Sequence, residues 1–144
     1  MTENASDQIQ TQNGKQILTQ FKNIAIVGIS DNPERPSYRV AKYLIEHGYE
    51  VIGVNPGKNE ILGRPCYPNL KSIPHPIEVV DVFRAVEFLP GIIDDAIQIQ
   101  AKAIWLQEGL TSPPAEEKAR AQGILVVSDI CMKKLHEAHL SQGS

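Results

Sequence analysis

The most constraining feature of this sequence is an unbroken apolar run from Ile24 to Ile29. A run of this length without polar residues is typical of a strand buried on both faces of a sheet. A loop separates it from residues 37–47, where Tyr38, Ala41, Leu44 and Ile45 fall on one helical stripe. Ser37 is suited to capping the start of this helix, and Gly48 to ending it. A buried strand followed by an amphipathic helix is the unit from which parallel sheets are built.

The same alternation continues along the chain. Apolar runs of strand length span residues 51–54, 79–83, 103–106 and 124–127, and amphipathic stretches span residues 92–97, 113–120 and 132–140. The exception is residues 57–76, a Pro- and Gly-rich crossover with room for a short strand near Ile61 and Leu62. The pattern predicts an α/β fold, a doubly wound three-layer sandwich with a five-stranded, mainly parallel sheet in the order 3-2-1-4-5. Ligands bind such sheets beyond the carboxyl ends of the strands, here in the crevice between strands one and four.

The length of 144 residues suits one domain. We expect a polar N-terminal segment with a short helix over residues 1–20, the domain over residues 21–140 and a polar tail over residues 141–144. The net charge of −3 argues against nucleic-acid binding, and no apolar run approaches the roughly 18 residues of a membrane span. Because the N-terminus lacks the apolar core of a secretory signal and Cys66 and Cys131 lie far apart, we expect a cytoplasmic protein with reduced thiols.

The loop after the first strand is suited to binding a phosphate. Gly28 lets the backbone turn without a Cβ clash, and the helix beyond it offers N–H groups and the positive end of its dipole. Ser30 and Ser37 add hydroxyl donors, and Arg35 and Arg39 add positive charge. The single glycine does not make the G-x-G-x-x-G fingerprint, so an ordinary loop with arginines in solvent is the alternative.

The segment after the second strand lacks the acidic residue with which a NAD site holds the ribose diol. It reads Val54, Asn55 and Pro56, with Lys58 close behind. A cation here suits a nucleotide whose ribose carries a phosphate, as in coenzyme A or NADP. The alternative for Lys58 is a solvated side chain in a turn, so the missing acid is the more informative signal.

The later strand ends supply the remaining candidate ligand contacts. Phe83 could cover an adenine or a pantetheine arm, and Arg84 could meet a phosphate or pair with Glu87. Gln107 is expected to point toward the mouth of the crevice, and Gly109 permits close approach of a ligand to the backbone.

Four further polar residues carry weaker signals. Asp81, inside the third strand, is expected to make structural hydrogen bonds. The spacing of Cys131, His136 and His139 matches no zinc pattern, and we expect polar residues of a surface helix there. A nucleophilic Cys–His pair lacks an evident third group to orient it.

Taken together, these motifs closely resemble the family of small stand-alone CoA-binding proteins. The resemblance covers about residues 21–140 and rests on the segments VGIS (27–30), RPSYRV (35–40), VNP (54–56), VDVFR (80–84), IWLQEG (104–109) and DICM (129–132). It implies a Rossmann-like domain, similar to the CoA-binding domain of the succinyl-CoA synthetase alpha subunit.

The resemblance also implies a role for each candidate. Phosphates would lie against the loop after the first strand, the adenine beside residues 54–56 and the ribose phosphate near Lys58, with Gln107 and Gly109 closing the groove. The residues expected to bind the cofactor are Gly28, Ile29, Ser30, Arg35, Ser37, Arg39, Val54, Asn55, Pro56, Lys58, Phe83, Arg84, Gln107 and Gly109.

The function implied by the resemblance is non-catalytic binding of coenzyme A or an acyl-CoA at the carboxyl ends of the parallel strands. The phosphorylated histidine of the synthetase belongs to its second domain, so the resemblance does not imply ligase chemistry. The alternative is a small enzyme, either an NADP-binding reductase or an acyl-CoA handling protein that uses Cys131 or His136. We expect no catalytic or metal-binding set and no nucleic-acid or membrane partner, and a homodimer stays open.

Overall fold

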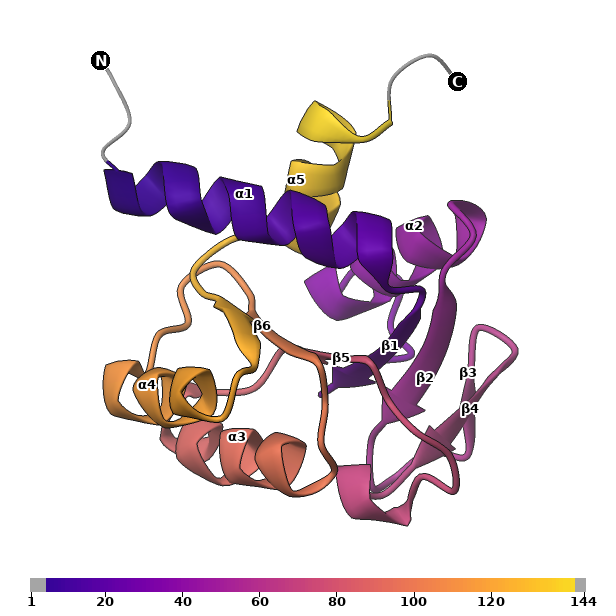
Figure 1. Cartoon of the computed structure of the whole chain (residues 1–144). Helices are drawn as coiled ribbons and strands as arrows, with labels where there is room; N and C mark the ends of the chain where they lie inside the picture. Colours follow the sequence, from indigo (N-terminus) through magenta and orange to yellow (C-terminus); the bar gives the residue numbers. More distant parts are fainter. Residues whose placement is uncertain (1–4, 142–144) are drawn as a thin grey trace.

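The computed structural model describes residues 5–141, and Figure 1 shows a sheet between two layers of helices. The α-helices are α1 (Ala5–Gln20), α2 (Pro36–Glu46), α3 (Leu89–Gln98), α4 (Pro113–Ala121) and α5 (Met132–His139). The strands are β1 (Asn23–Val27), β2 (Glu50–Val54), β3 (Glu60–Ile61), β4 (Arg64–Tyr67), β5 (Val79–Val82), β6 (Ala103–Leu106) and β7 (Leu125–Val127). Two 3₁₀ helices, η1 (Leu70–Ser72) and η2 (Val86–Phe88), complete the elements. Most of the predicted polar tail lies outside the described residues.

The alternating pattern correctly predicted where the main strands and helices form. The five apolar runs became β1, β2, β5, β6 and β7, and the amphipathic stretches became α2 to α5. Gly48, with φ of 90°, follows α2 as expected. Ser37, however, does not cap this helix, because Arg35 holds the capping position and Pro36 begins the helix.

The predicted number and order of strands are wrong. The sheet has seven strands in the order β3-β4-β2-β1-β5-β6-β7. The third apolar run, β5, pairs with β1 on the side away from β2, and Ile26 lies opposite Asp81. The place beyond β2 is taken by β4, which also forms an antiparallel hairpin with β3.

The crossover between β2 and β5 explains this difference. It contains the short strand expected near Ile61, as β3, and it continues into β4 before the chain returns to β1. The order of the parallel strands therefore reverses between β1 and β5, rather than between the first and fourth apolar runs. This reversal sets the position of the ligand site.

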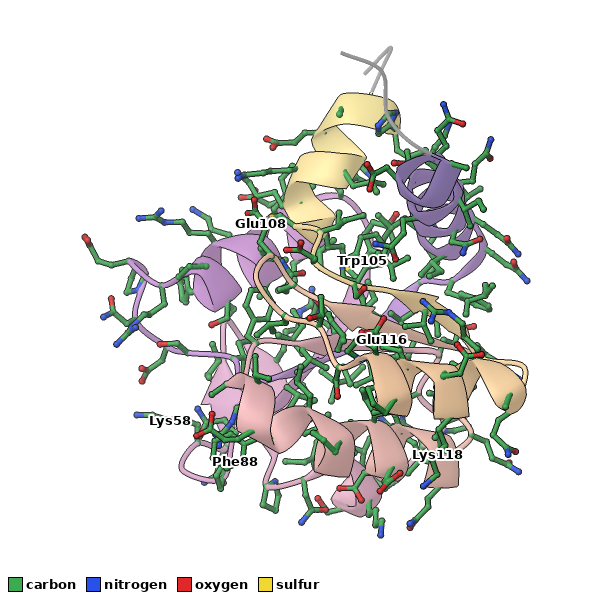
Figure 2. The ribbon with its side chains drawn as sticks, turned by 90° about the vertical axis from the view of Figure 1, so that its left-hand side faces the viewer. Lys58, Phe88, Trp105, Glu108, Glu116 and Lys118 are labelled. Carbon is green, nitrogen blue, oxygen red and sulfur yellow. The ribbon has the colours of Figure 1, made fainter. Side chains whose placement is uncertain are left out.

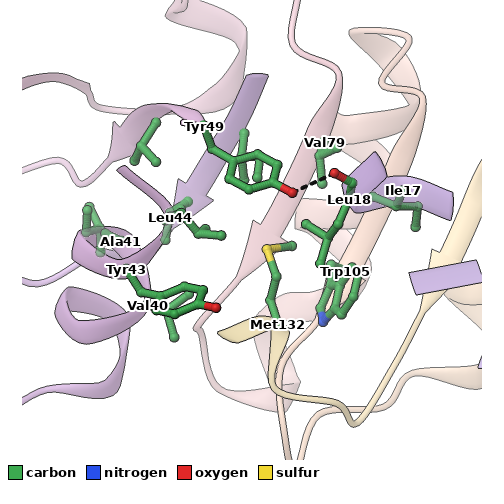
Figure 3. Packing of buried hydrophobic residues seen from close by; sticks show 14 of the residues in the cluster. Ile17, Leu18, Val40, Ala41, Tyr43, Leu44, Tyr49, Val79, Trp105 and Met132 are labelled. Carbon is green, nitrogen blue, oxygen red and sulfur yellow. Dashed lines mark hydrogen bonds between the residues drawn. The ribbon is translucent and has the colours of Figure 1, made fainter. Parts of the chain in front are cut away.

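Each face of the sheet has its own apolar core. The side chains of β6 alternate between the two faces, so Trp105 packs under α1, α2 and α5 while Leu106 packs under α3 and α4. In Figure 3, Trp105 lies beside Leu18 and Met132, which belong to the same core cluster. The indole N–H of Trp105 donates a hydrogen bond to the Ile130 carbonyl at 2.8 Å, so this large ring is buried without an unsatisfied donor.

Helix α1 is longer than the short helix predicted and packs closely against the sheet. Its own residues Ile17 and Leu18 are fully buried in the core. Gly14 lies so close to the sheet that an added Cβ would be 2.9 Å from Trp105 Cη2. The Gln10 side-chain amide donates a hydrogen bond to the Ser128 carbonyl at 2.6 Å and accepts one from the Ser128 N–H at 2.9 Å. These contacts cover the edge of the sheet where β7 ends.

Candidate functional site

A groove of about 880 Å³ lies beyond the carboxyl ends of β1, β2 and β5, at the point where the strand order reverses. Its volume is within the roughly 300–1,000 Å³ typical of small-molecule sites. Four stretches of chain supply its lining: the β1–α2 loop, the end of β2, the start of η1, and the segment from the end of β5 into α3. They contribute Val27, Gly28, Ile29, Ser30, Asp31, Arg35, Pro36, Ser37, Val54, Asn55, Pro56, Pro68, Asn69, Leu70, Phe83, Arg84, Phe88, Gly91, Ile92 and Asp95.

The β1–α2 loop brings hydroxyl groups to the groove. The Ser37 hydroxyl oxygen accepts a hydrogen bond from the Ser30 N–H at 2.9 Å, and the Ser30 hydroxyl oxygen accepts one from the Asn32 N–H at 3.0 Å. Because each oxygen is used here as an acceptor, each hydroxyl hydrogen can be donated to a ligand. Arg35, also in the lining, adds a positive charge. This arrangement is suited to an anion such as a phosphate.

Gly28 turns the chain at the end of β1 in a conformation that few other residues adopt. Its φ is 87°, and an added Cβ would collide with the carbonyl oxygen of Phe83. The N–H of Phe83 in turn donates to the Val27 carbonyl at 2.8 Å. The close approach that Gly28 permits is therefore to the neighbouring strand end.

The loop after β2 is tied to the β1–α2 loop by side chains. The Asn55 amide donates to the Ile29 carbonyl at 2.8 Å and accepts from the Gly57 N–H at 2.8 Å. Lys58 forms an ion pair with Asp31 at 2.8 Å. The hydrogen bond within this pair raises the pKa of Lys58 and lowers that of Asp31. These contacts fix the positions of the two loops relative to each other.

Phe88, which the sequence analysis did not select, replaces Phe83 as the exposed aromatic of the groove. Phe83 is half-buried and packs on the core beneath α1, α2 and α5. Phe88 is 47% exposed, and the Arg84 guanidinium lies 4.3 Å from the centre of its ring. Within the part of the chain that the structure describes, Arg84 and Glu87 form no ion pair. Figure 2 shows Phe88 and Lys58 at the same corner of the molecule in that view.

Four of the predicted site residues lie outside the groove lining: Arg39, Lys58, Gln107 and Gly109. Gln107 was expected to face the crevice, but it follows β6, and β5 separates β6 from the reversal point between β1 and β5. Its side chain is buried, and its amide oxygen accepts from the Met132 N–H at 3.3 Å. The N–H of Gly109 donates to the Asp129 carboxylate at 2.6 Å. Both residues connect the ends of β6 and β7.

The groove also contains residues that the sequence analysis missed. They come from the start of η1 and from α3: Pro68, Asn69, Leu70, Gly91, Ile92 and Asp95. The crossover that carries η1 has no helical or strand periodicity, so its position over the sheet could not be read from the pattern. Phe88 was missed as well, because it lies in η2, beyond the end of β5, and the sequence alone does not show that its ring is exposed.

Asp81 does not make the structural hydrogen bonds that we expected of it. It is fully buried in β5, and neither carboxylate oxygen has a hydrogen-bond partner. Burial raises its pKa well above the usual carboxyl range, which favours the neutral acid. Asp81 is not part of the groove lining.

The residues of the enzymatic alternatives also lie outside the groove lining. His136 is buried rather than on a helix surface, and its Nδ1 forms a 2.7 Å hydrogen bond with the Tyr43 hydroxyl. Its pKa is lowered, chiefly by burial and also by the neighbouring His47 and Lys22. Cys131 is a half-buried free thiol. Between residues 5 and 141, no three His, Cys, Asp or Glu side chains gather as a metal site, and no helix is long and apolar enough to cross a membrane.

Comparisons with known proteins agree on one family. Residues 22–137 match the family model described as CoA binding domain. The chain is 41% identical over 122 residues to the uncharacterized protein YneT of Bacillus subtilis, a match that spans 85% of this chain and 90% of YneT. A solved structure of a hypothetical protein from Pyrococcus horikoshii superposes with a TM-score of 0.90 at 41% identity, over 98% of this chain and all of that one.

A more distant relative is part of a much larger enzyme. The chain is 28% identical over 89 residues to the alpha subunit of an ADP-forming acetate–CoA ligase from Pyrococcus furiosus. The match spans 58% of this chain but only 19% of that subunit.

Proposed function

We propose that this chain, which belongs to the CoA binding domain family, binds coenzyme A or an acyl-CoA in the groove and catalyses no reaction of its own. The observation that carries the proposal is the composition of the groove at the reversal point. Serine hydroxyls and Arg35 supply contacts for phosphate in the β1–α2 loop, and the apolar residues Leu70, Phe88 and Ile92 also line the groove. Coenzyme A combines several phosphates with a base and a largely uncharged arm, which this composition suits.

The loop after β2 favours coenzyme A over NAD. A NAD site needs a carboxylate at this strand end to hold the ribose diol. The position is occupied by Asn55, whose amide is already used to hold Ile29 and Gly57. Lys58 follows it and supplies the cation that a ribose phosphate would need.

The positions of the candidate nucleophiles favour binding over catalysis. A catalytic group must reach the reacting atoms. Neither Cys131 nor His136 lies in the groove lining, and the His136 ring is engaged with Tyr43. We extend the proposal to a cytoplasmic location, and we leave a homodimer open until the molar mass is measured by light scattering.

A thermal-shift panel tests the proposed ligand. Coenzyme A, acetyl-CoA, dephospho-CoA, NAD and NADP are each added to the full chain at increasing concentration. A ligand present at about 100 times its dissociation constant adds about 2.7 kcal/mol to the free energy of unfolding. We expect coenzyme A and acetyl-CoA to raise the melting temperature and NAD to leave it unchanged. Stabilisation by NADP without stabilisation by coenzyme A would favour the reductase instead.

A further inference from the structure

Helix α5 packs with α1 and α2 on one face of the sheet (Figure 1). Its buried residues are Met132, Leu135 and His136. Leu135 lies against α1 beside Trp105, since a Cβ added at Gly14 would be 2.7 Å from Leu135 Cδ1 and 2.9 Å from Trp105 Cη2. The helix has eight residues, and isolated helices shorter than about 12 residues are marginal in water. Helix α5 therefore depends on this packing, and we call the packed helix docked.

The His136 ring lies in a cluster of aromatic side chains. Three rings from α2 and the turn after it lie beside it, with centre-to-centre distances of 5.4 Å to Tyr43, 5.2 Å to His47 and 5.8 Å to Tyr49. The Tyr43 hydroxyl is bonded to Nδ1 of His136. A protonated imidazole has a hydrogen on both nitrogens, so Nδ1 would no longer accept from this hydroxyl. The docked arrangement is suited to the neutral ring.

The surroundings of His136 oppose a positive charge on its ring. Burial is the main reason that its pKa is lowered, and His47, at the end of α2, and Lys22, in the segment after α1, add to the effect. Glu137 on α5 acts in the opposite direction, but its carboxylate pairs with Lys133 at 3.6 Å. An undocked helix would lose the burial and the positive neighbours together.

We propose that α5 is a pH-sensitive element, which leaves its place on α1 and α2 as the pH falls and His136 takes up a proton that the docked helix excludes. In the undocked helix the ring is in water, where a histidine has its ordinary pKa of about 6.5. Below that pH the undocked state binds a proton and the docked state does not. The ratio of docked to undocked helix therefore falls by up to about tenfold for each pH unit, until the pKa of the docked state is reached.

Undocking has a structural consequence, because it uncovers the apolar residues Met132, Leu135 and Trp105. The cluster around His136 shares no residue with the groove lining. The inference therefore stands apart from the proposed function.

Trp105 provides the signal for a test on the full chain, because it is the single tryptophan and is fully buried. Its fluorescence is recorded from about pH 7.5 to about pH 4.5, and we expect the emission to move to longer wavelength below about pH 6.5. Hydrogen exchange, corrected for the intrinsic effect of pH, then locates the change. Residues 132–139 should lose about tenfold in protection between about pH 7 and about pH 5, while β1 keeps its protection.

Two variants show whether His136 is the titrating group. His136→Asn removes the titrating ring and keeps an acceptor for the Tyr43 hydroxyl. Its emission and its protection of α5 should not change over the same pH range, even where α5 is less firmly docked than in the wild type. His139→Asn is the matched control, because His139 is exposed on the same helix, and it should keep the wild-type pH dependence.

A proton NMR titration of the wild-type histidine rings provides a measurement that needs no variant. The His136 ring signal should change together with the Trp105 emission, because the ring gains its proton when α5 undocks. Emission and protection that do not depend on pH in the wild type would overturn the inference. The wild-type pH dependence in His136→Asn, or a loss of protection in β1 together with α5, would overturn it as well.

Discussion

At the scale of the single residue, Gly28 shows how closely the groove and the fold depend on each other. The sequence predicted that Gly28 lets the backbone turn in a loop suited to binding a phosphate. The structure shows that a Cβ at this position would collide with the Phe83 carbonyl oxygen, at a φ of 87°. We expect Gly28→Ala to lower the free energy of unfolding by about 2 kcal/mol or more, measured in urea. Gly63→Ala is the control, because Gly63 has a φ of 73° and open space around it. A loss equal to that of Gly63→Ala would mean that backbone strain alone makes glycine necessary at Gly28.

Asp81 allows a second test at this scale, through the pH dependence of stability. Burial raises the pKa of Asp81 in the folded protein above its value in the unfolded chain. As the pH rises past the ordinary carboxyl pKa, the unfolded chain releases this proton and the folded protein retains it. The free energy of unfolding therefore falls, by up to about 1.4 kcal/mol for each pH unit, until the folded pKa is reached. Asp81→Asn should thus become more stable relative to the wild type between pH 4 and pH 7.

Denaturation curves across that pH range provide the measurement. Asp94→Asn serves as the control, because Asp94 is half-exposed and paired with Lys118. It should show no gain that grows with pH. If the stabilities of Asp81→Asn and the wild type stay parallel from pH 4 to pH 7, then Asp81 is ionised in the folded protein and has a partner.

At the scale of the element, α1 acts as a cover for the edge of the sheet. The Gln10 amide bonds to both backbone groups of Ser128, just beyond β7, as a neighbouring strand would. Gln10→Ala should cost about 1–2 kcal/mol of unfolding free energy and speed hydrogen exchange at the Ser128 amide. Gln16→Ala, on the same helix, removes only an exposed bond to Gln20 and should stay within about 0.5 kcal/mol. Equal effects of the two substitutions would mean that α1 is held by its apolar residues alone.

The elements also show what could and could not be predicted from the sequence. Residues 24–27 and 103–106 were recognisable as strands because uninterrupted apolar runs report burial on both faces. The strand order could not be recognised in this way, because a hydrophobic pattern indicates which residues are buried and not which strands are neighbours. The loop residues Ser30 and Asn55 were found at their strand ends, whereas Leu70 and Asp95 were missed. Those two reach the groove only through the packing of η1 and α3 over the sheet.

At the scale of the whole molecule, the groove has a direction that a ligand must follow. The β1–α2 loop brings the serine hydroxyls and Arg35 to the groove, and Lys58 lies in the loop after β2, paired with Asp31. The adenosine end of coenzyme A would thus lie toward β2, and the pantetheine arm would leave on the other side. Lys58 would meet the 3′-phosphate, for which it must exchange its partner Asp31.

Two ligands that differ by that single phosphate test this direction. Lys58→Ala should weaken coenzyme A by about tenfold and barely change dephospho-CoA, because only the former carries the 3′-phosphate. Arg35→Ala, in the β1–α2 loop, should weaken both ligands alike. Asp31→Asn frees Lys58 from its ion pair and should enlarge the preference for coenzyme A. Added salt should reduce the preference, since Lys58 and Asp31 are exposed. If Lys58→Ala penalises the two ligands equally, the ligand runs in the opposite direction, with its pantetheine arm over Asn55 and Pro56.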